Sequence, residues 1–201
     1  MVKLVDTLGL GPSAFGRGGS SPLSGTTQYY KNFMGIFLLV LLFAILLSFF
    51  YSVVRAISWV PMWGKDIKTI LDLADVKKDD KVYDLGCGDG KVVFAAADRG
   101  AKAEGLEISV LPYLIANARK IISRNKAKIS FKDFWMTDLS DADLVYFFLI
   151  PRIYPKLKTK LEKDLKPGAK VIAYVWPIEG WEPTKVEKRE KGPAIYLYEI
   201  K

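Results

Sequence analysis

Histidine is absent from the 201 residues of the chain, and cysteine occurs only once. The absence of histidine removes the commonest general base and the commonest metal ligand, and one cysteine cannot form an internal disulfide. Zinc hydrolases and enzymes with Ser-His-Asp or Cys-His arrangements are therefore excluded, and no metal site is expected. Half of the residues are hydrophobic and 26% are charged, so the chain can bury an ordinary core and is not disordered as a whole.

The charge is unbalanced but not segregated. The chain has 30 basic and 22 acidic residues, which gives a formal net charge of +8 at pH 7. Such an excess suits nucleic acid, anionic lipid or an acidic protein, and charge alone does not choose among them. Because the lysines are mixed with acidic residues, we interpret most of this charge as a solvated surface.

One uncharged segment, residues 33–54, reads FMGIFLLVLLFAILLSFFYSVV. As a helix it would be about 33 Å long, enough to cross a hydrocarbon core of about 30 Å. A signal peptide would have a shorter core and a cleavage site, and a buried globular helix would carry a polar face. The sequence therefore predicts one transmembrane helix within residues 31–57, with Tyr51, Trp59 and Trp63 at the membrane interface.

The basic residues around this segment predict its orientation. Arg55, Lys65 and Lys68 follow it, whereas only Lys31 lies just before it. The positive-inside rule then places the C-terminal part in the cytoplasm. We expect a single-pass membrane protein with the lipid bilayer as a partner and a cytoplasmic catalytic domain.

Residues 1–30 are rich in glycine, serine, proline and threonine and show no apolar periodicity. We expect a disordered leader. An alternative is that translation starts downstream, at Met34 or near Gln28. The reason is that DNA encoding residues 3–8 and 18–22 can resemble the D arm and the T arm of a tRNA gene.

Residues 58–201 are expected to form a single α/β domain. A short helix is predicted over residues 66–74, and strands then alternate with helices. The predicted strands are 81–85, 101–107, 129–131, 144–149 and 171–175, the predicted helices between them are 91–98, 109–122 (capped by Ser109) and 153–165, and residues 185–190 and 194–200 are predicted to form an antiparallel hairpin. This alternation is typical of an α/β fold.

A glycine-rich turn, residues 86–90, connects the first strand of this domain to a helix. Strand, glycine turn and helix together form the opening of nucleotide-binding folds, where backbone N–H groups approach a ligand closely. Lys91 stands where the dinucleotide fingerprint requires a small residue, which weakens the dehydrogenase interpretation. The P-loop sequence does not occur, which excludes that class.

The segment Asp84-Leu85-Gly86-Cys87-Gly88-Asp89-Gly90 resembles the D-x-G-x-G-x-G motif of class I S-adenosylmethionine-dependent methyltransferases. The resemblance covers residues 61–201 and implies a Rossmann-like seven-stranded sheet of order 3-2-1-4-5-7-6, methyltransferase activity and S-adenosyl-L-methionine as the cofactor. In that family the glycine turn holds the methionine part of the cofactor, and an acid at the end of the second strand receives the ribose hydroxyls. By this resemblance the cofactor-binding residues are Asp84, Gly86, Cys87, Gly88, Asp89, Gly90, Glu107, Asp133, Phe134 and Trp135.

Two of these assignments have structural alternatives. Glu107 matches the ribose-binding acid, but an acid at the end of a strand can also be an ordinary surface residue. Asp133 matches the position that contacts the exocyclic amine of adenine, with Phe134 or Trp135 against the ring. The alternative for the two aromatic residues is a buried pair in the core.

Further segments resemble the membrane-anchored protein-lysine N-methyltransferases that modify the adenine nucleotide translocase and the ATP synthase c-subunit. This resemblance implies methylation of a membrane-associated protein. Pro112 stands later than in the family's usual acid-x-x-Pro, and no mitochondrial transit peptide is visible, so we expect a prokaryotic relative of these enzymes. The matching segments are Trp59-Val60-Pro61, Phe148-Leu149-Ile150-Pro151, residues 157–167 and Gly180-Trp181-Glu182-Pro183.

A lysine acceptor has to lose a proton from an amine whose ordinary pKa is about 10.4. No catalytic acid or base can be assigned from the sequence. Our hypothesis is that Trp63, Tyr146 and Phe148 desolvate the amine while carbonyl groups of residues 149–151 align it, so that Pro61 and Pro151 also belong to the substrate site. The alternative is that these aromatic residues belong to the core or the membrane interface.

Two other functions remain open at this point, and a third is disfavoured. A small site beside a bilayer also suits a lipid or quinone methyltransferase. The alternative that is not an enzyme is a membrane-tethered module that binds the cofactor but catalyses no reaction. An RNA methyltransferase is disfavoured, and nucleic acid is not expected as a partner, because the Asn/Asp-Pro-Pro-Tyr motif is missing after the fourth strand and no RNA-binding domain is added.

Overall fold

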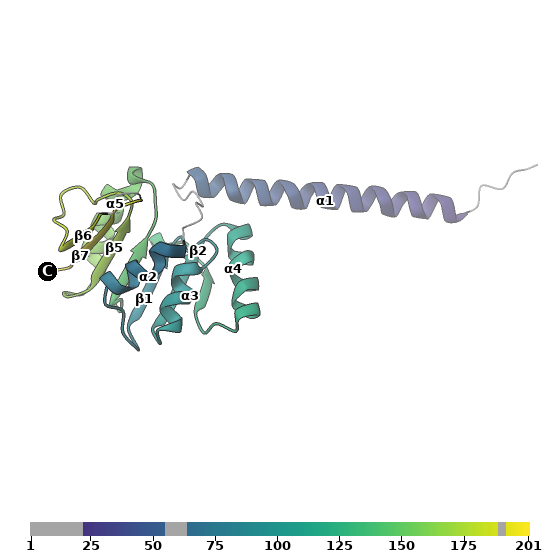
Figure 1. Cartoon of the computed structure of the whole chain (residues 1–201). Coiled ribbons are helices and arrows are strands. Elements are labelled where there is room, and N and C mark those ends of the chain that lie inside the picture. The colour runs from purple at the N-terminus through teal and green to yellow at the C-terminus, as the bar shows by residue number, and fades with distance from the viewer. Residues whose placement is uncertain (1–21, 55–63, 189–191) are drawn as a thin grey trace, which may run out of the picture. The chain divides into compact units, whose positions relative to one another are not determined.

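The computed structural model describes residues 22–54, 64–188 and 192–201 (Figure 1). The chain divides into two compact units, Met1–Phe43 and Ala44–Lys201. The first contains most of a long N-terminal helix, and the second contains the α/β domain. The predictions for residues 1–21, for Trp59 and for the side chain of Tyr51 lie outside the described residues.

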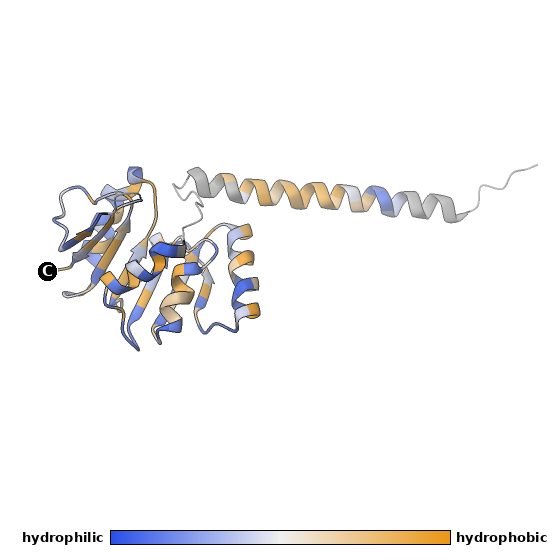
Figure 2. Ribbon diagram, viewed as in Figure 1, coloured by the Kyte–Doolittle hydropathy of each residue, from blue (hydrophilic) through white to orange (hydrophobic). Residues whose placement is uncertain are grey.

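Helix α1, Pro22–Val54, is continuous through the uncharged segment. Its stretch Tyr29–Ser48 is 20 residues long and apolar enough to cross a membrane by length and composition. Figure 2 shows the run of hydrophobic residues along this helix. The helix begins earlier than the predicted boundary at residue 31, with Pro22 in the first turn, where the missing N–H of proline has no intrahelical partner to lose.

Seven strands form one sheet in the order β3-β2-β1-β4-β5-β7-β6, which confirms the predicted order. The first five strands in the chain pair in parallel, and β7 runs antiparallel to both β5 and β6. The strands are β1 Lys81–Leu85, β2 Lys102–Glu107, β3 Lys128–Phe131, β4 Leu144–Phe147, β5 Lys170–Tyr174, β6 Lys185–Glu187 and β7 Ile195–Glu199.

The helices of the domain are α2 Gly64–Leu73, α3 Lys91–Asp98, α4 Val110–Ser123 and α5 Tyr154–Asp164, with short 3-10 helices η1 Phe134–Met136 and η2 Pro151–Ile153. The predicted strand 144–149 ends earlier, at Phe147, because the chain turns into η2 at Pro151, which has no N–H for a strand ladder. Ser109 stands at the N-cap of α4 as predicted, but its side chain makes no capping hydrogen bond.

Helices cover both faces of the sheet (Figure 1). Alternate side chains of the parallel strands enter two hydrophobic clusters. Residues of α2, α3 and α4 contribute to the cluster that contains Tyr146 and Tyr174, and residues of α5 contribute to the one that contains Phe147. Burial on both faces is typical of parallel strands in α/β proteins, and it leaves the ends of the strands as the place for polar chemistry.

The packing of α5 predicts a stability effect. Leu161 is fully buried in the cluster of Phe147, so the substitution Leu161→Ala should lower the free energy of unfolding by about 2–5 kcal/mol. Urea unfolding of the detergent-solubilised protein, followed by tryptophan fluorescence, measures this change. Thr159→Ala on the exposed side of the same helix serves as the control. Equal effects of the two substitutions would contradict the described packing of α5.

Candidate functional site

The glycine turn between β1 and α3 depends on backbone conformations that side chains disfavour. Gly86, Gly88 and Gly90 have φ angles of 77°, 55° and 81°. At Gly90 an added Cβ would lie 2.7 Å from Cζ of the Phe94 ring, so steric contact excludes a side chain there as well. The N–H of Gly86 donates to the carbonyl of Leu106 at 2.8 Å, which holds the turn against the end of β2.

Cys87 belongs to the turn through its backbone and to the core through its side chain. Its N–H also donates to the carbonyl of Leu106, at 3.1 Å. The side chain is 8% exposed and faces Gly105 of β2, where an added Cβ would lie 2.6 Å from Sγ. Burial, together with the negative charges of Asp84 and Glu107, raises the pKa of the thiol well above its ordinary value. The structure therefore shows packing for this side chain, whereas its predicted cofactor contact would use the backbone.

Glu107, the last residue of β2, joins its own strand to the glycine turn. One carboxylate oxygen accepts hydrogen bonds from the N–H groups of Ile108 and Ser109 at 2.9 and 2.7 Å, and the other accepts from Gly88 at 3.0 Å. The residue is 2% exposed, so the alternative of an ordinary surface acid is wrong. A carboxylate has about four acceptor positions, and three are used here. A ligand hydroxyl can use the remaining position or compete with Gly88.

Asp89 is held by two cations. Its carboxylate pairs with Arg119 of α4 at 2.5 Å and with Lys91 of α3 at 3.2 Å. The side chain is buried, and the pairs connect the turn to two helices. The described geometry is that of a residue that fixes the loop, and the predicted contact with the cofactor stays a prediction.

Asp84 lies in surroundings that disfavour its charged form. It is 2% exposed, and burial, followed by the negative charges of Glu107 and Asp89, raises the pKa of its carboxyl well above the ordinary value of 3.8. A buried carboxylate beside other carboxylates attracts a positively charged ligand. The cofactor expected from the sequence has a positively charged sulfur and an ammonium group, so this residue fits it.

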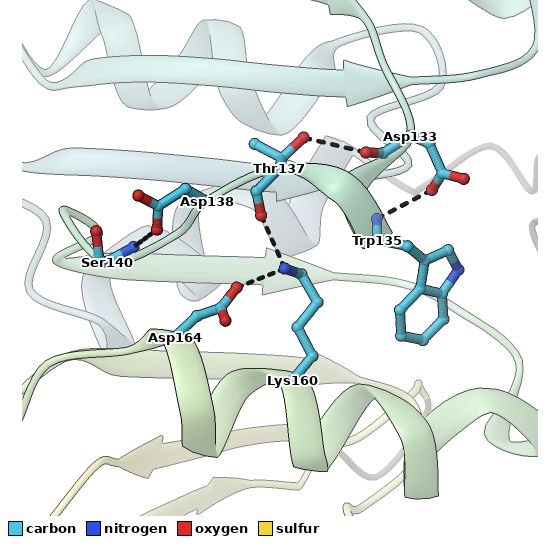
Figure 3. A network of polar contacts seen from close by, with 7 residues as sticks. All are labelled: Asp133, Trp135, Thr137, Asp138, Ser140, Lys160 and Asp164. Carbon is cyan, nitrogen blue, oxygen red and sulfur yellow. Dashed lines mark hydrogen bonds and ion pairs between the residues drawn. The ribbon is translucent and has the colours of Figure 1, made fainter.

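Asp133, Phe134 and Trp135 follow β3 but take different roles, and Figure 3 shows the first and the last of them. Asp133 accepts a hydrogen bond from the Trp135 N–H at 2.9 Å and so caps the short helix η1. Phe134 is 1% exposed in the core, which agrees with the structural alternative for this residue. Trp135 is half-buried, with the ammonium of Lys156 4.4 Å from its ring centroid. Of the two aromatic residues, Trp135 therefore has ring surface to offer a ligand.

The same segment is tied to its surroundings by a lysine. Lys160 of α5 donates to the carbonyl of Thr137 at 2.7 Å and pairs with Asp164 (Figure 3). The N–H of Lys132 donates to the carbonyl of Glu107 at 3.2 Å. The exits of β2 and β3 thus meet at one edge of the sheet.

The predicted substrate residues are only partly brought together. Tyr146 is 2% exposed, and burial and the charge of Asp84 raise its pKa well above the ordinary value. Phe148, two residues after Tyr146, is half-buried, whereas Pro151 is exposed at the start of η2. Pro61 and Trp63 lie outside the described residues.

Two of the carbonyl groups expected to align the amine already accept hydrogen bonds. The hydroxyl of Tyr154 donates to the Leu149 carbonyl at 3.2 Å, and the N–H of Ile153 donates to the Ile150 carbonyl at 3.3 Å. These contacts form η2 and the start of α5. An aligning role would need the second lone pair of each oxygen.

Three residues at this edge were missed by the sequence analysis. Tyr174 ends β5, Trp176 follows it, and the Tyr174 hydroxyl donates a hydrogen bond to Asp66 of α2. Phe148 contacts both rings, at centroid distances of 5.0 Å to Tyr174 and 6.0 Å to Trp176. The available signal was that one aromatic residue ends β5 and another follows it, on a strand that pairs with β4. In the part of the chain that the structure describes, no group of three acidic, histidine or cysteine residues is placed to hold a metal ion.

Comparison with known proteins identifies relatives of the domain. The family model described as the ANTKMT methyltransferase domain matches residues 84–185. A protein-lysine N-methyltransferase of Saccharolobus islandicus (strain REY15A) is 39% identical over 156 residues, which cover 74% of this chain and 97% of the relative. The lysine N-methyltransferase of the ATP synthase c-subunit from Rattus norvegicus is 30% identical over 151 residues, or 72% of this chain and 68% of the relative.

A solved structure is similar as well. The crystal structure of an RNA methyltransferase from Salinibacter ruber in complex with S-adenosyl-L-homocysteine has a TM-score of 0.66 and 32% sequence identity. The match covers 70% of this chain and 94% of that chain. The similarity therefore extends over nearly the whole of that protein.

The hydrogen bonds of Glu107 predict an effect on ligand affinity. The substitution Glu107→Gln replaces an acceptor with an NH₂ group that opposes backbone N–H donors, so the affinity for S-adenosyl-L-homocysteine should fall roughly tenfold or more. Isothermal titration calorimetry measures the affinity. The control is Glu104→Gln on the same strand, where the carboxylate binds Ser130 and Lys128 and no residue of the turn. An unchanged affinity for Glu107→Gln would remove Glu107 from the binding site.

The raised pKa of Asp84 predicts opposite effects on stability and binding. Because the pKa is higher in the folded than in the unfolded protein, the ligand-free protein should lose stability as the pH rises from 3.8 through the raised value. The substitution Asp84→Asn removes that loss and should raise the Tm of the ligand-free protein at pH 7, while it weakens cofactor binding. Thermal unfolding with and without S-adenosyl-L-homocysteine measures both effects. A lower Tm without ligand, or unchanged binding, would contradict this role.

Proposed function

The chain is an S-adenosyl-L-methionine-dependent methyltransferase of the ANTKMT family, and on that premise we propose that it methylates lysine side chains of a membrane-associated protein. The observation that carries the proposal is the match to the Saccharolobus islandicus protein-lysine N-methyltransferase, which extends over 97% of that relative. Such a match includes the segments around the strand ends, where acceptor specificity is built in α/β enzymes. The rat relative, named for lysine methylation of the ATP synthase c-subunit, supports an acceptor of the same class.

We further propose that α1 anchors the enzyme in a bilayer. The support is the apolar stretch Tyr29–Ser48, together with exposed leucine and phenylalanine side chains that water would not favour. In this proposal residues 1–30 are the leader, residues 31–57 hold the membrane span, and residues 58–201 form the catalytic domain. The basic residues Arg55, Lys65 and Lys68 favour a cytoplasmic position for that domain.

The proposed work of the cofactor-binding residues follows from their surroundings. S-adenosyl-L-methionine, when bound, supplies a methyl group on a positively charged sulfur. Asp84 faces this charge, Glu107 accepts the ribose hydroxyls, and the glycine turn brings backbone close to the ligand without side chains between them. Asp133 and Trp135, which follow β3, are the residues that we propose for the adenine. Each of these residues binds or orients the cofactor, and none needs to act as a strong acid or base.

The acceptor amine has to become neutral before it can react as a nucleophile. Burial lowers the pKa of an amine because a low-dielectric surrounding disfavours its charged form. We propose that Phe148, which packs on the same hydrophobic cluster as Tyr146, excludes water at the place where the amine binds. Pro61, Trp63 and Pro151 stay proposals as further parts of this site.

Two other classes of methyl acceptor, RNA and a lipid or quinone, have specific support. The labelling experiment described below distinguishes them from lysine. The solved relative is named an RNA methyltransferase, and the net charge of +8 would suit RNA. Proximity to a bilayer would suit a lipid or quinone. Buried acidic residues at the candidate site, Asp84 and Glu107, disfavour a phosphate-bearing acceptor because like charges repel.

A labelling experiment tests the proposal. The full-length detergent-solubilised enzyme is incubated with radiolabelled S-adenosyl-L-methionine and membranes from a strain that lacks the gene, and protein, lipid and RNA are then separated. We expect label in a protein band that yields methyllysine on hydrolysis, and we expect Glu107→Ala to reduce it at least tenfold. We also expect detergent, but not alkaline carbonate, to extract the enzyme from membranes.

The other outcomes separate the alternatives. Label in the lipid or RNA fraction would replace the lysine acceptor with that class of molecule. Release of the enzyme by carbonate would contradict the membrane anchor without affecting the lysine acceptor.

A further inference from the structure

Aromatic side chains form a continuous wall from the end of β4 to the end of β5. Phe148 lies perpendicular to the Tyr174 ring at 5.0 Å and stacks on Trp176 at 6.0 Å, with an interplanar angle of 27°. Trp176 is 37% exposed, Phe148 is half-buried and Tyr174 is 2% exposed. The wall therefore leads from the surface to the interior, and its inner end carries a hydroxyl group.

That hydroxyl is oriented by a buried acid. Asp66, in the first turn of α2, is 4% exposed, and its carboxylate accepts the hydrogen bond of the Tyr174 hydroxyl. A phenol has a single proton to donate. Because this proton is directed to Asp66, the Tyr174 oxygen meets any further partner as an acceptor. The groups that suit such an oxygen are N–H donors, and an amine is one of them.

The backbone beside Tyr174 is strained. Val175 has a φ angle of 81°, which is rare for a β-branched residue, and its N–H donates to the carbonyl of Ala194 at 2.8 Å. Such a conformation is unfavourable and persists where the surrounding structure enforces it, frequently at functional sites. At this position it ends β5 between Tyr174 and Trp176, the two residues that contact Phe148.

Negative charge converges on the inner end of the wall from two elements. Burial raises the pKa of Tyr146, and the charges of Asp84 on β1 and Asp66 on α2 raise it further. Buried acids beside aromatic faces repel phosphate, and they suit the N–H groups of an amine as hydrogen-bond donors. The aliphatic stem of a lysine side chain also suits contact with the faces of Phe148 and Trp176.

We propose that Tyr174 is a substrate-binding residue whose hydroxyl oxygen accepts a hydrogen bond from the amine to be methylated, and that Asp66 is a positioning residue that acts through Tyr174. Phe148 and Trp176 form the walls along which the alkyl chain of the acceptor reaches that oxygen. The acceptor class is thus a primary amine on a long aliphatic chain. The inference rests on the proposed lysine N-methyltransferase function and adds to it the place where the amine binds.

Kinetics of the full-length enzyme test the inference. The variants are Tyr174→Phe, which keeps the ring, and Asp66→Asn, which keeps the size of the side chain. Membranes from the strain that lacks the gene serve as the acceptor at varied concentration, and n-butylamine serves as an inhibitor that mimics the lysine side chain. We expect both variants to lower kcat/KM for the membrane acceptor roughly tenfold or more and to lose inhibition by n-butylamine.

One further readout separates this role from a structural one. The affinity of Tyr174→Phe for S-adenosyl-L-homocysteine should stay close to that of the unchanged enzyme, although its Tm should fall because the buried Asp66 carboxylate loses a hydrogen bond. The controls are Asp72→Asn, which removes the surface ion pair of the same helix with Arg99, and Tyr196→Phe on β7. Both controls should retain full kcat/KM and inhibition by n-butylamine.

The failure of this inference differs from the failure of the proposed function. If the unchanged enzyme puts no label on lysine, the proposed function is wrong whatever the variants do. If it labels lysine and Tyr174→Phe keeps kcat/KM and n-butylamine inhibition, the role of Tyr174 is overturned. If Tyr174→Phe loses cofactor affinity together with kcat/KM, the residue supports the fold or the cofactor site, and the inference is likewise overturned.

Discussion

The geometry of the site depends on one carboxylate. Glu107 accepts hydrogen bonds from its own strand exit and from Gly88 in the turn after β1, so two neighbouring strand ends share a single side chain. Without it, the N–H groups of Gly88 and Ser109, which are buried, and that of Ile108, which is partly buried, would lose their acceptor. Each buried group that loses its partner costs about 1–3 kcal/mol. The Lys132 N–H, which donates to the Glu107 carbonyl, extends the same connection to β3. Three consecutive strand exits are thereby fixed relative to one another.

The domain concentrates buried acids where its strands end. Asp84, Glu107 and Asp66 are each less than 5% exposed, and they come from β1, β2 and α2. A fold selected for stability alone would not collect them, because buried like charges oppose one another. Their common position is understandable in an enzyme whose ligands bring positive charge on a sulfonium and on an amine. The same acids that lower the stability of the ligand-free domain then stabilise its complexes with these ligands.

The sequence predicted the sheet order and most elements because local patterns specify them. The strand before the glycine turn and the helix after it have the predicted limits, since a glycine turn separates two different periodicities. The contact between Asp66 and Tyr174 joins residues 108 positions apart, and no local sequence pattern predicts such a pair. Phe134 was ambiguous for a related reason: a motif shows that an aromatic residue follows β3, but only packing shows that this ring is in the core while Trp135 stays accessible.

The close approach of β2 to the turn has a chemical consequence for the one thiol of the chain. Sγ of Cys87 occupies the space that a side chain at position 105 would need. Burial also raises the pKa of the thiol and so keeps it protonated. Oxidants and alkylating reagents attack thiolates that solvent can reach. A turn built in this way places sulfur next to the proposed cofactor site and withholds its nucleophilic form, so we expect oxidants to leave this thiol unmodified.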